Sequence, residues 1–438
     1  MKLKRSEFIA AAGSMLIPGV CLSGGMPHLR VGLLSDTHVN PDPKSCDRTR
    51  MAFGVFKREN VDAIAHLGDL SNYHQAEAYR NYRKTIEEAF PDAGKSPKFL
   101  YAWGNHDSID YERRANPKDR QIDRHKAFAV MKDILKIEHG LDFEMELAGY
   151  AFLGFPERIT DSCSVEEYER RIAAACRRHP GKPVFVLDHP PPYGTCDNSK
   201  KGCAKTSLKV LSGYPQVVSI NGHKHTSVMN ERSIWQGDFT VVQTSCLYNW
   251  FANWDYLEAG ERAQVRSGYG VMVMDVYADR LVFRRFDVRS GEEYRPDARW
   301  TVPVPFSPDT APYSTARRRK DERSGVFPDG AAVIAKADRK NTWVWVRFPA
   351  VVNPGDVRTY KVVAERITPT GKVNVACSHV IGDFDELPSG RHGFLTARFE
   401  AAKFKQGEKF LFTVSTEGFF GKKGAALSTE WIATGKTA

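Results

Sequence analysis

The sequence predicts an α/β domain followed by a smaller all-β sandwich. Over residues 27–295, short apolar runs typical of buried strands alternate with helix-prone segments, as in α/β folds. Over residues 327–438, the apolar runs have a period of two, and turn residues rather than helices separate them. Residues 296–326 lie between these regions and are rich in proline and basic residues, so we predict a linker there.

Each predicted strand of the α/β domain is a short apolar run that ends in glycine or in a polar residue. The runs are 29–34, 61–67, 99–102, 184–187 and 217–220, with further strands at 239–244, 269–276 and 280–286 and a hairpin over 143–155. Helices are predicted at 48–59, 73–89 and 165–178. Residues 108–142 are polar and helix-prone, which is typical of an insertion or a cap near a site.

The all-β region contains three clear strands, at 342–348, 360–365 and 410–415, with proline and glycine turns between them. This pattern resembles a fibronectin type III or immunoglobulin-like module. The region has no cluster of titratable side chains, so we expect the chemistry to lie N-terminal to it. The sequence does not indicate which partner such a module would bind.

The chain carries 63 Lys and Arg against 53 Asp and Glu, a net charge of +10. Such an excess favours anionic substrates, anionic surfaces or nucleic acid, or it forms a solvated basic surface without a partner. No basic block is interleaved with aromatic residues, as a nucleic-acid groove requires, so nucleic acid is not the expected partner. No apolar run reaches the ~18 residues of a membrane span, so we expect no transmembrane segment.

Residues 1–25 are typical of an export signal. A basic start precedes an apolar stretch at 8–20, and small residues follow it. The start is similar to a twin-arginine signal, but Ser6 stands in place of the second arginine, so the export route stays open. Lipid attachment at Cys21 is disfavoured, because the preceding valine is larger than the small residue that such a site requires. We therefore expect a periplasmic or secreted protein, with a disordered N-terminal tail as the alternative.

The chain has eight cysteines, and seven remain if Cys21 is removed with the signal. Cys196 and Cys203 share one polar loop and are the best candidates for a disulfide, ahead of Cys163 and Cys176. No Cys-x-x-Cys pair is present, so a cysteine zinc site is not expected.

Metal-capable side chains follow five of the predicted strands. They are Asp36 and His38, Asp69, Asn105 with His106 and Asp107, His189, and His223 with His225. Open α/β sheets place their ligands at the carboxyl ends of the strands, so we expect these side chains to converge. Without His106 and Asp107, the set still holds three carboxylate or amide oxygens and four imidazoles, which are too many ligands for one ion and suit two ions of borderline hardness.

Taken in order, these motifs resemble the metal pattern of the calcineurin-like metallophosphoesterase superfamily over residues 29–290. The motifs read Asp36-x-His38, Gly68-Asp69, Gly104-Asn105-His106-Asp107, His189 and Gly222-His223-x-His225. The resemblance implies a four-layer αββα sandwich and two divalent or trivalent ions, with manganese, iron and zinc as candidates. It assigns Asp36, His38 and His225 to one metal, Asn105, His189 and His223 to the other, and Asp69 as the bridge.

The resemblance also implies the chemistry: hydrolysis of phosphate esters by metal-activated hydroxide. It gives His106 the role of protonating the leaving alkoxide or of stabilising charge on the phosphoryl oxygens, and imidazole suits proton transfer near neutral pH. Asp107 either orients His106 or supports the loop. Glycines 68, 104 and 222 let the backbone approach the ions closely.

Several branches of the superfamily fit poorly. Purple acid phosphatases carry glycine at the position of His38 and a tyrosine at the position of Asn72. Phosphoprotein phosphatases follow the bridging aspartate with Asp-Arg-Gly, which is missing here. What remains resembles bacterial phosphodiesterases and phosphatases that act on small phosphate esters, with diesters slightly favoured over monoesters. The alternatives are a non-catalytic cell-surface binding protein with a vestigial phosphoesterase domain, or an exported nuclease.

Two further features stay open at this point. The aromatic stretch 247–254 follows the last predicted ligand by one strand, and it either walls the substrate pocket or packs against the C-terminal module. His74 follows Asp69 closely, and it either contacts substrate or serves a structural role.

Overall fold

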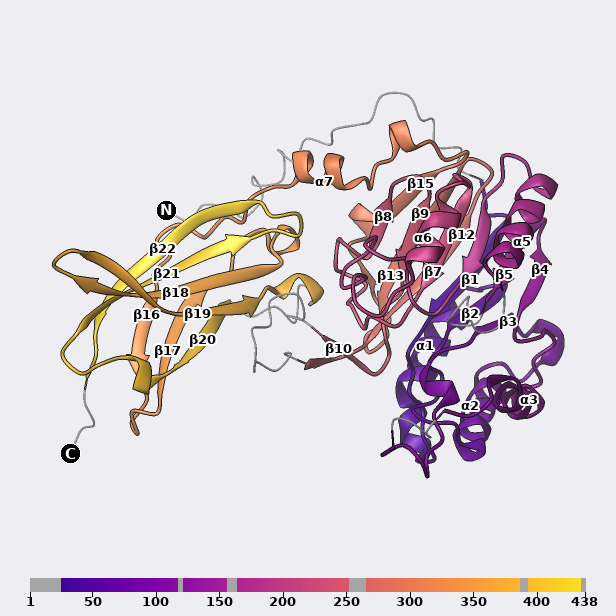
Figure 1. Ribbon diagram of the computed structural model, residues 1–438, viewed down its shortest axis with the longest axis horizontal. Coiled ribbons are helices and arrows are strands. Elements are labelled where there is room, and N and C mark those ends of the chain that lie inside the picture. Colours follow the sequence, from indigo (N-terminus) through magenta and orange to yellow (C-terminus); the bar gives the residue numbers. More distant parts are fainter. Residues whose placement is uncertain (1–24, 117–120, 156–163, 252–264, 387–392, 435–438) are drawn as a thin grey trace, which may run out of the picture.

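The computed structural model describes residues 25–116, 121–155, 164–251, 265–386 and 393–434. The predicted export signal therefore lies, apart from its last residue, outside the described residues, and so does Cys163. No helix of the described chain is both long and apolar enough to cross a membrane. The described chain forms an α/β part and an all-β part that lie side by side (Figure 1).

The first sheet of the α/β part combines three parallel strands with four antiparallel ones. Its order is β14-β13-β12-β1-β2-β3, and β15 also pairs with β13. The parallel strands are β1 (Leu29–Leu34), β2 (Ala63–Leu67) and β3 (Lys98–Ala102). The antiparallel strands are β12 (Gly270–Val276), β13 (Arg280–Asp287), β14 (Glu293–Tyr294) and β15 (Trp300–Pro303).

The second sheet has six strands in the order β4-β5-β6-β7-β9-β8. They are β4 (Phe143–Leu147), β5 (Tyr150–Gly154), β6 (Val184–Leu187), β7 (Val217–Asn221), β8 (Ile234–Gln236) and β9 (Thr240–Gln243). Strands β5, β6, β7 and β9 run parallel, and β4 and β8 are antiparallel edge strands. A short separate ribbon is formed by β10 (Asn249–Phe251) and β11 (Val265–Ser267).

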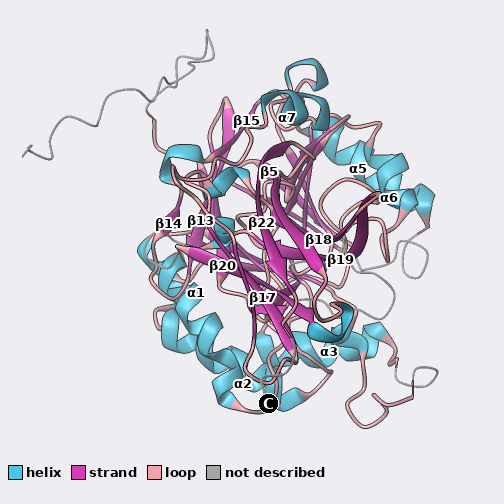
Figure 2. Cartoon of the chain, turned by 90° about the vertical axis from the view of Figure 1, so that its left-hand side faces the viewer, coloured by secondary structure: helices cyan, strands magenta, loops and turns pink. Residues whose placement is uncertain are grey.

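Four layers result from the packing of these sheets. The central core lies between the two sheets, where Leu33 and Leu67 of the first sheet belong to one apolar cluster with Leu187 and Ile220 of the second. Helices α1 (Asp47–Arg58), α2 (Ala76–Ala89) and α3 (Arg124–Leu135) cover the outer face of the first sheet. Helices α5 (Val165–Arg178) and α6 (Lys205–Leu211) cover the second. The predicted αββα sandwich is confirmed, and Figure 2 shows the helices at the periphery of the strands.

Helix α3 differs from the expectation of an insertion or cap over 108–142. Its residues Ala127, Phe128, Met131 and Leu135 are buried in the same cluster as α1 and α2. The apolar face of this helix therefore belongs to the outer helix layer. Its polar residues face outward, which is why composition alone made the segment resemble an addition to the domain.

The C-terminal part is a sandwich of a three-stranded and a four-stranded antiparallel sheet. Their orders are β16-β17-β20 and β19-β18-β21-β22. The strands are β16 (Ile334–Ala337), β17 (Trp343–Pro349), β18 (Thr359–Thr368), β19 (Gly371–Ile381), β20 (Phe394–Glu400), β21 (Lys409–Glu417) and β22 (Lys423–Ile432). Alternate residues of β17, β18 and β21 face one shared core, so the expected all-β domain is confirmed.

The region expected to be a linker contains regular structure. Strand β15 extends the first sheet, and α7 (Thr315–Asp321) carries the basic run along the connection between the two parts (Figure 1). Arg318 on this helix forms a short ion pair with the Glu231 carboxylate of the α/β part. The basic run therefore contributes at least one side chain to internal contacts.

The two parts share a buried interface. Trp250 contacts Phe384, with 6.2 Å between ring centroids, and Phe384 contacts Phe419 at 4.9 Å. All three belong to the central core cluster of the α/β part. Arg358 of the sandwich donates to the buried Asp197 carboxylate at 2.9 Å. Because an ion pair withdrawn from water depends on both partners, this contact fixes the sandwich against the loop that carries Asp197.

That same loop corrects the disulfide prediction. Cys196 and Cys203 are both free thiols. The Cys196 Sγ is buried 3.5 Å from the carbonyl oxygen of Ser233, while the Cys203 Sγ lies 3.7 Å from that of Lys201. The predicted pairing was wrong, because shared loop membership does not bring the two sulfur atoms together.

Candidate metal centre

The predicted metal ligands come from five loops that meet between the two sheets. Each loop follows a strand at its carboxyl end, namely β1, β2 and β3 in the first sheet and β6 and β7 in the second. Three groups of side chains place one donor atom each within 4.8 Å of one another: Asp36, His38 and His225; His38, Asp69 and His106; and Asp69, His189 and His223. The groups share His38 and Asp69, so they form one continuous cluster.

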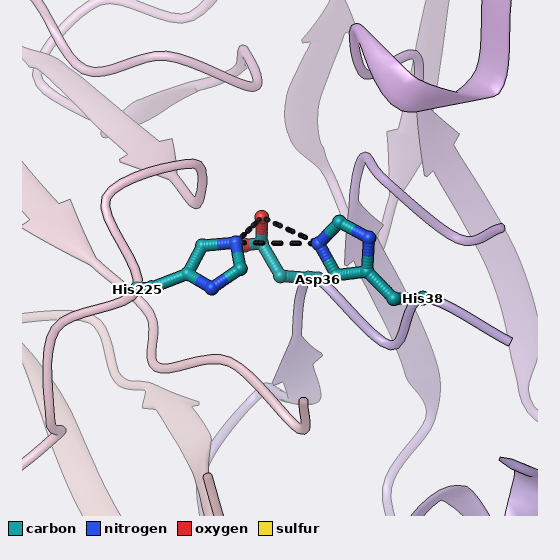
Figure 3. A group of neighbouring side chains, drawn as sticks. All are labelled: Asp36, His38 and His225. Atoms are coloured by element: carbon teal, nitrogen blue, oxygen red, sulfur yellow. Dashed lines mark hydrogen bonds and ion pairs between the residues drawn. The ribbon is translucent and has the colours of Figure 1, made fainter. Parts of the chain in front are cut away.

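Short distances define the first of these groups (Figure 3). Oδ1 of Asp36 lies 3.1 Å from Nε2 of His225 and 3.9 Å from Nε2 of His38. The two imidazole Nε2 atoms are 3.2 Å apart. In the last group, Oδ2 of Asp69 lies 3.1 Å from Nε2 of His189. The donor atoms therefore point at common centres.

In Asp36 and in Asp69, one carboxylate oxygen accepts a backbone N–H and the other faces the imidazoles. Oδ2 of Asp36 accepts the backbone N–H of His223 at 2.9 Å. Oδ1 of Asp69 accepts the backbone N–H of His106 at 2.8 Å. One oxygen of each carboxylate thus fixes a neighbouring loop, and the other is left to face the histidines.

Several donor atoms are buried without any hydrogen-bond partner. They are Oδ1 of Asp36, Oδ1 of Asn105 and Nε2 of His189. Oδ1 of Asp36 and Nε2 of His189 each have one ion-pair neighbour at 3.1 Å, and Oδ1 of Asn105 has no hydrogen-bond partner, so these donors can accept another occupant. Buried oxygen and imidazole donors of this kind fit metal cations.

Backbone carbonyls orient two of the imidazoles. The Nδ1 of His189 donates to the carbonyl of Leu67, and that of His225 donates to the carbonyl of Asn249, each at 2.6 Å. A carbonyl only accepts, so the proton resides on Nδ1 in both rings. Nε2 of each ring is consequently the nitrogen that faces the centre, as a metal ligand requires.

The electrostatics of the cluster favour positive charge. For Asp36, burial opposes ionisation, but the imidazoles of His225 and His189 hold the pKa of the carboxyl well below its usual range. For His189, burial opposes protonation, but the carboxylates of Asp69 and Asp36 raise its pKa to about 10. Burial lowers the pKa of His38 to about 3. The two carboxylates therefore create a strong demand for cations in a region shielded from water.

The backbone of the centre is strained. Asp36, His38, Asp69, His223 and His225 all adopt positive φ, between 45° and 70°. Left-handed backbone is uncommon outside glycine and costs of order 1–3 kcal/mol per residue at such sites. These are five of the seven predicted ligands. Strain concentrated at these positions indicates that the fold aims these side chains at a functional centre.

Two glycines permit the loops to approach. A Cβ atom at Gly104 would lie 2.2 Å from both the backbone nitrogen and Oδ1 of Asp69. A Cβ atom at Gly222 would lie 1.8 Å from Oγ of Ser35 and 2.6 Å from Oδ2 of Asp36. Any side chain at either position would displace an aspartate of the cluster.

His106 lies at the open side of the cluster. It begins a short 3-10 helix (His106–Ser108) after β3, and its ring is partly exposed. Its Nδ1 donates to the carbonyl of Asn72 at 3.0 Å, and its ring centroid is 4.7 Å from that of His38. Nε2 is therefore the nitrogen available for proton transfer.

Asp107 is fully buried and joins two loops. One oxygen accepts the backbone N–H of Ser71 at 3.0 Å, and the other accepts that of Gly104 at 3.1 Å. These contacts connect the loop after β2 with the loop after β3. These bonds give Asp107 a role in supporting the two loops, and neither of them reaches the His106 ring.

In the aromatic stretch 247–254, the described residues fill both predicted roles: one ring lies beside the cluster and another packs against the sandwich. The Tyr248 ring lies 5.1 Å from the ring of His38, at the rim of the cluster. Trp250, two residues later, packs against Phe384 of the sandwich. Residues 252–254 lie outside the described residues. Nδ1 of His74 forms a hydrogen bond with the Tyr79 hydroxyl at 2.9 Å. Of the two roles left open for His74, this contact favours the structural one.

Sequence reasoning missed several supporting groups. The carbonyls of Leu67, Asn72 and Asn249 orient imidazoles, but a backbone carbonyl leaves no signal in the sequence. Arg48, whose Nη1 donates to the Leu247 carbonyl at 3.0 Å, comes from α1, which lies almost two hundred residues earlier. Only the tertiary fold brings these groups to the centre.

Comparisons with known proteins agree with this geometry. Residues 29–227 match the calcineurin-like phosphoesterase family. These residues form a calcineurin-like metallophosphoesterase domain. The match supports a hydrolase that acts on phosphoric esters, and the family resemblance seen in the motifs is confirmed over residues 29–227. No curated protein matches the chain in sequence.

Several solved structures are similar to parts of this chain. A dimetal phosphatase from Danio rerio has 15% identity and a TM-score of 0.38, covering 63% of this chain and 98% of its own. A purple acid phosphatase from yellow lupin (Lupinus luteus) seeds has 10% identity and a TM-score of 0.41, covering 63% of this chain and 53% of its own. A human fibronectin III domain has 9% identity and a TM-score of 0.20, covering 26% of this chain and 86% of its own.

Gly104→Ala should impair cation binding without altering any ligand, because the added methyl group displaces Asp69. In the wild type, Mn²⁺ should raise the thermal unfolding midpoint, since a ligand at 100 times its Kd adds about 2.7 kcal/mol of stability. Gly104→Ala should lose most of that shift in differential scanning fluorimetry. The control is Gly54→Ala in α1, where a Cβ meets nothing within 4 Å. An undiminished shift in Gly104→Ala would contradict the proposed packing.

Proposed function

We propose that this domain hydrolyses small phosphate esters with two metal ions held by seven side chains. Asp36, His38 and His225 would hold one ion, Asn105, His189 and His223 the other, and Asp69 would bridge them. The observation that carries the proposal is the cluster of oxygen and imidazole donors whose atoms lie within 4.8 Å of one another in three overlapping groups. The mixture of oxygen and imidazole donors suits manganese, iron or zinc.

Bound cations of this kind supply positive charge that polarises a phosphoryl group and activates the attacking water. The protein's own residues supply the remaining functions. His106 would protonate the leaving-group oxygen through Nε2, because its Nδ1 is committed to the carbonyl of Asn72. Asp107 would act as a positioning residue, because it holds the Gly104 and Ser71 backbones that flank His106 and Asp69.

Phosphodiesters are the favoured substrate class. A diester carries one negative charge at its phosphate, whereas a monoester carries nearly two near neutral pH and needs more cationic compensation. Two cationic side chains near the described cluster are already engaged. Arg48 donates to the carbonyls of Leu247 and Tyr248, and Lys224 donates to the carbonyl of Lys201. Neither is directed at a phosphate.

We also propose that the reaction takes place outside the cytoplasm. The basic start of the chain, its apolar stretch at 8–20 and the small residues after it support export.

Purified protein loaded with Mn²⁺ should cleave bis-p-nitrophenyl phosphate with a higher kcat/KM than p-nitrophenyl phosphate. The reason is the smaller charge of the diester at a site where Arg48 and Lys224 are both bonded to backbone carbonyls. Release of p-nitrophenolate measures both reactions. A preference for the monoester would refute the assignment of substrate class. Turnover of neither substrate with any of manganese, iron or zinc would refute the proposed activity, and it would favour a non-catalytic binding protein.

His106→Ala should retain bound manganese and lose ~10²–10⁴ in kcat on a diester with an alkyl leaving group, such as glycerophosphocholine. The loss should be much smaller on bis-p-nitrophenyl phosphate, because p-nitrophenolate leaves without full protonation. His74→Ala is the matched control, since this partly buried imidazole bonds Tyr79 and should leave both rates near wild type. Equal losses on the two esters would refute a general-acid role, and loss of metal would make His106 a ligand.

A further inference from the structure

The exposed aromatic side chain of Tyr248 borders the metal centre. The residue is 43% exposed, which is unusual for a tyrosine whose ring lies 5.1 Å from a buried imidazole, that of His38. Among the described residues, the Tyr248 hydroxyl has no recorded hydrogen-bond partner. One side of the ring therefore contacts the cluster, and the rest is open to a molecule that approaches it.

The backbone around Tyr248 is fixed on both sides. Before it, Nη1 of Arg48 donates to the Leu247 carbonyl at 3.0 Å and also to the carbonyl of Tyr248 itself. After it, the Asn249 carbonyl accepts from Nδ1 of His225 at 2.6 Å. Trp250 is buried against Phe384 of the sandwich. The backbone that carries the ring is thus held in place before a substrate arrives, which lowers the entropic cost of using the ring in binding.

The position of the ring relative to His106 suggests what it would contact. The His38 ring has His106 at 4.7 Å and Tyr248 at 5.1 Å between centroids. A general acid must reach the oxygen of the leaving group, so the leaving group begins beside His106. Both rings flank the same imidazole. A leaving group that extends along this rim would therefore come within reach of the Tyr248 ring.

We propose that Tyr248 is a specificity-determining residue that stacks against the leaving group and selects phosphate esters of planar aromatic or heteroaromatic alcohols. This proposal rests on the proposed function and deepens it. A neutral phenol ring offers a π-face to another ring but no charge for an anion, and such ring pairs contribute about 0.5–1.5 kcal/mol beyond area burial. Arg48, which donates to the Tyr248 carbonyl, is engaged with backbone carbonyls.

The chain offers a matched control for this residue. Tyr111 is a second tyrosine of similar exposure, at 41% against 43%. Its ring packs on Tyr73 and under the guanidinium of Arg114. Replacing it removes the same exposed surface at a place that has no recorded contact with the cluster.

The test measures the binding of two phosphonates that differ only in their organic group. Isothermal titration calorimetry of the Mn²⁺-loaded full chain with phenylphosphonate and with methylphosphonate gives a ratio of Kd values. We expect the wild type to favour phenylphosphonate about tenfold, which corresponds to about 1.4 kcal/mol. Tyr248→Leu should bring the ratio close to one at unchanged manganese content. Tyr248→Phe and Tyr111→Leu should keep the wild-type ratio.

Two outcomes would overturn the proposal: a wild type that binds both phosphonates equally, or a Tyr248→Leu variant that keeps the preference. If Tyr248→Phe lost the preference for phenylphosphonate, the stacking proposal would be wrong and the hydroxyl group would be responsible for the preference. Turnover of bis-p-nitrophenyl phosphate by the same preparation distinguishes failure of the Tyr248 proposal from failure of the proposed activity. If turnover persists in these cases, the proposed function stands and only the role of Tyr248 fails. If neither turnover nor phosphonate binding occurs, both fail.

Discussion

Two aspartates hold the loops of this centre together while presenting oxygens to it. Asp36, after β1 in the first sheet, accepts the backbone N–H of His223, after β7 in the second. That bond joins the carboxyl edges of the two sheets where the apolar core between them ends. Asp69 makes the equivalent bond to His106 within the first sheet. These two bonds tie the backbones of His223 and His106 to the carboxylates beside which their side chains must act.

This arrangement has an energetic cost that the rest of the fold must offset. Positive φ at five predicted ligands and buried donor atoms without partners both oppose folding. The opposing contribution comes from the core between the sheets and the helix layers outside them, together with the interface to the sandwich through Trp250 and Arg358. Cations at the centre would remove part of the cost, so stability and function are coupled at the same atoms.

The sequence was sufficient for the architecture and for the identities of the clustered side chains. Short apolar runs ending in Asp, Asn and His placed the donors correctly at the strand ends, because strand direction alone brings them to one edge. The sequence did not reveal those features of the site that depend on tertiary contacts. Nothing in the sequence shows that the Asn249 carbonyl meets His225 or that Tyr248 and Trp250 face different neighbours. The composition of α3 concealed its buried face, and a shared loop suggested a disulfide that is absent.

The central claim is that seven side chains hold two cations close together around Asp69. Electron paramagnetic resonance of the protein with two equivalents of Mn²⁺ tests it most directly, because two ions about 3.5–4 Å apart and joined by a bridging ligand are exchange-coupled. The spectrum should be that of a coupled dinuclear centre, and Asp69→Ala should abolish the coupling. The uncoupled spectrum of isolated Mn²⁺ at the same loading would contradict the claim.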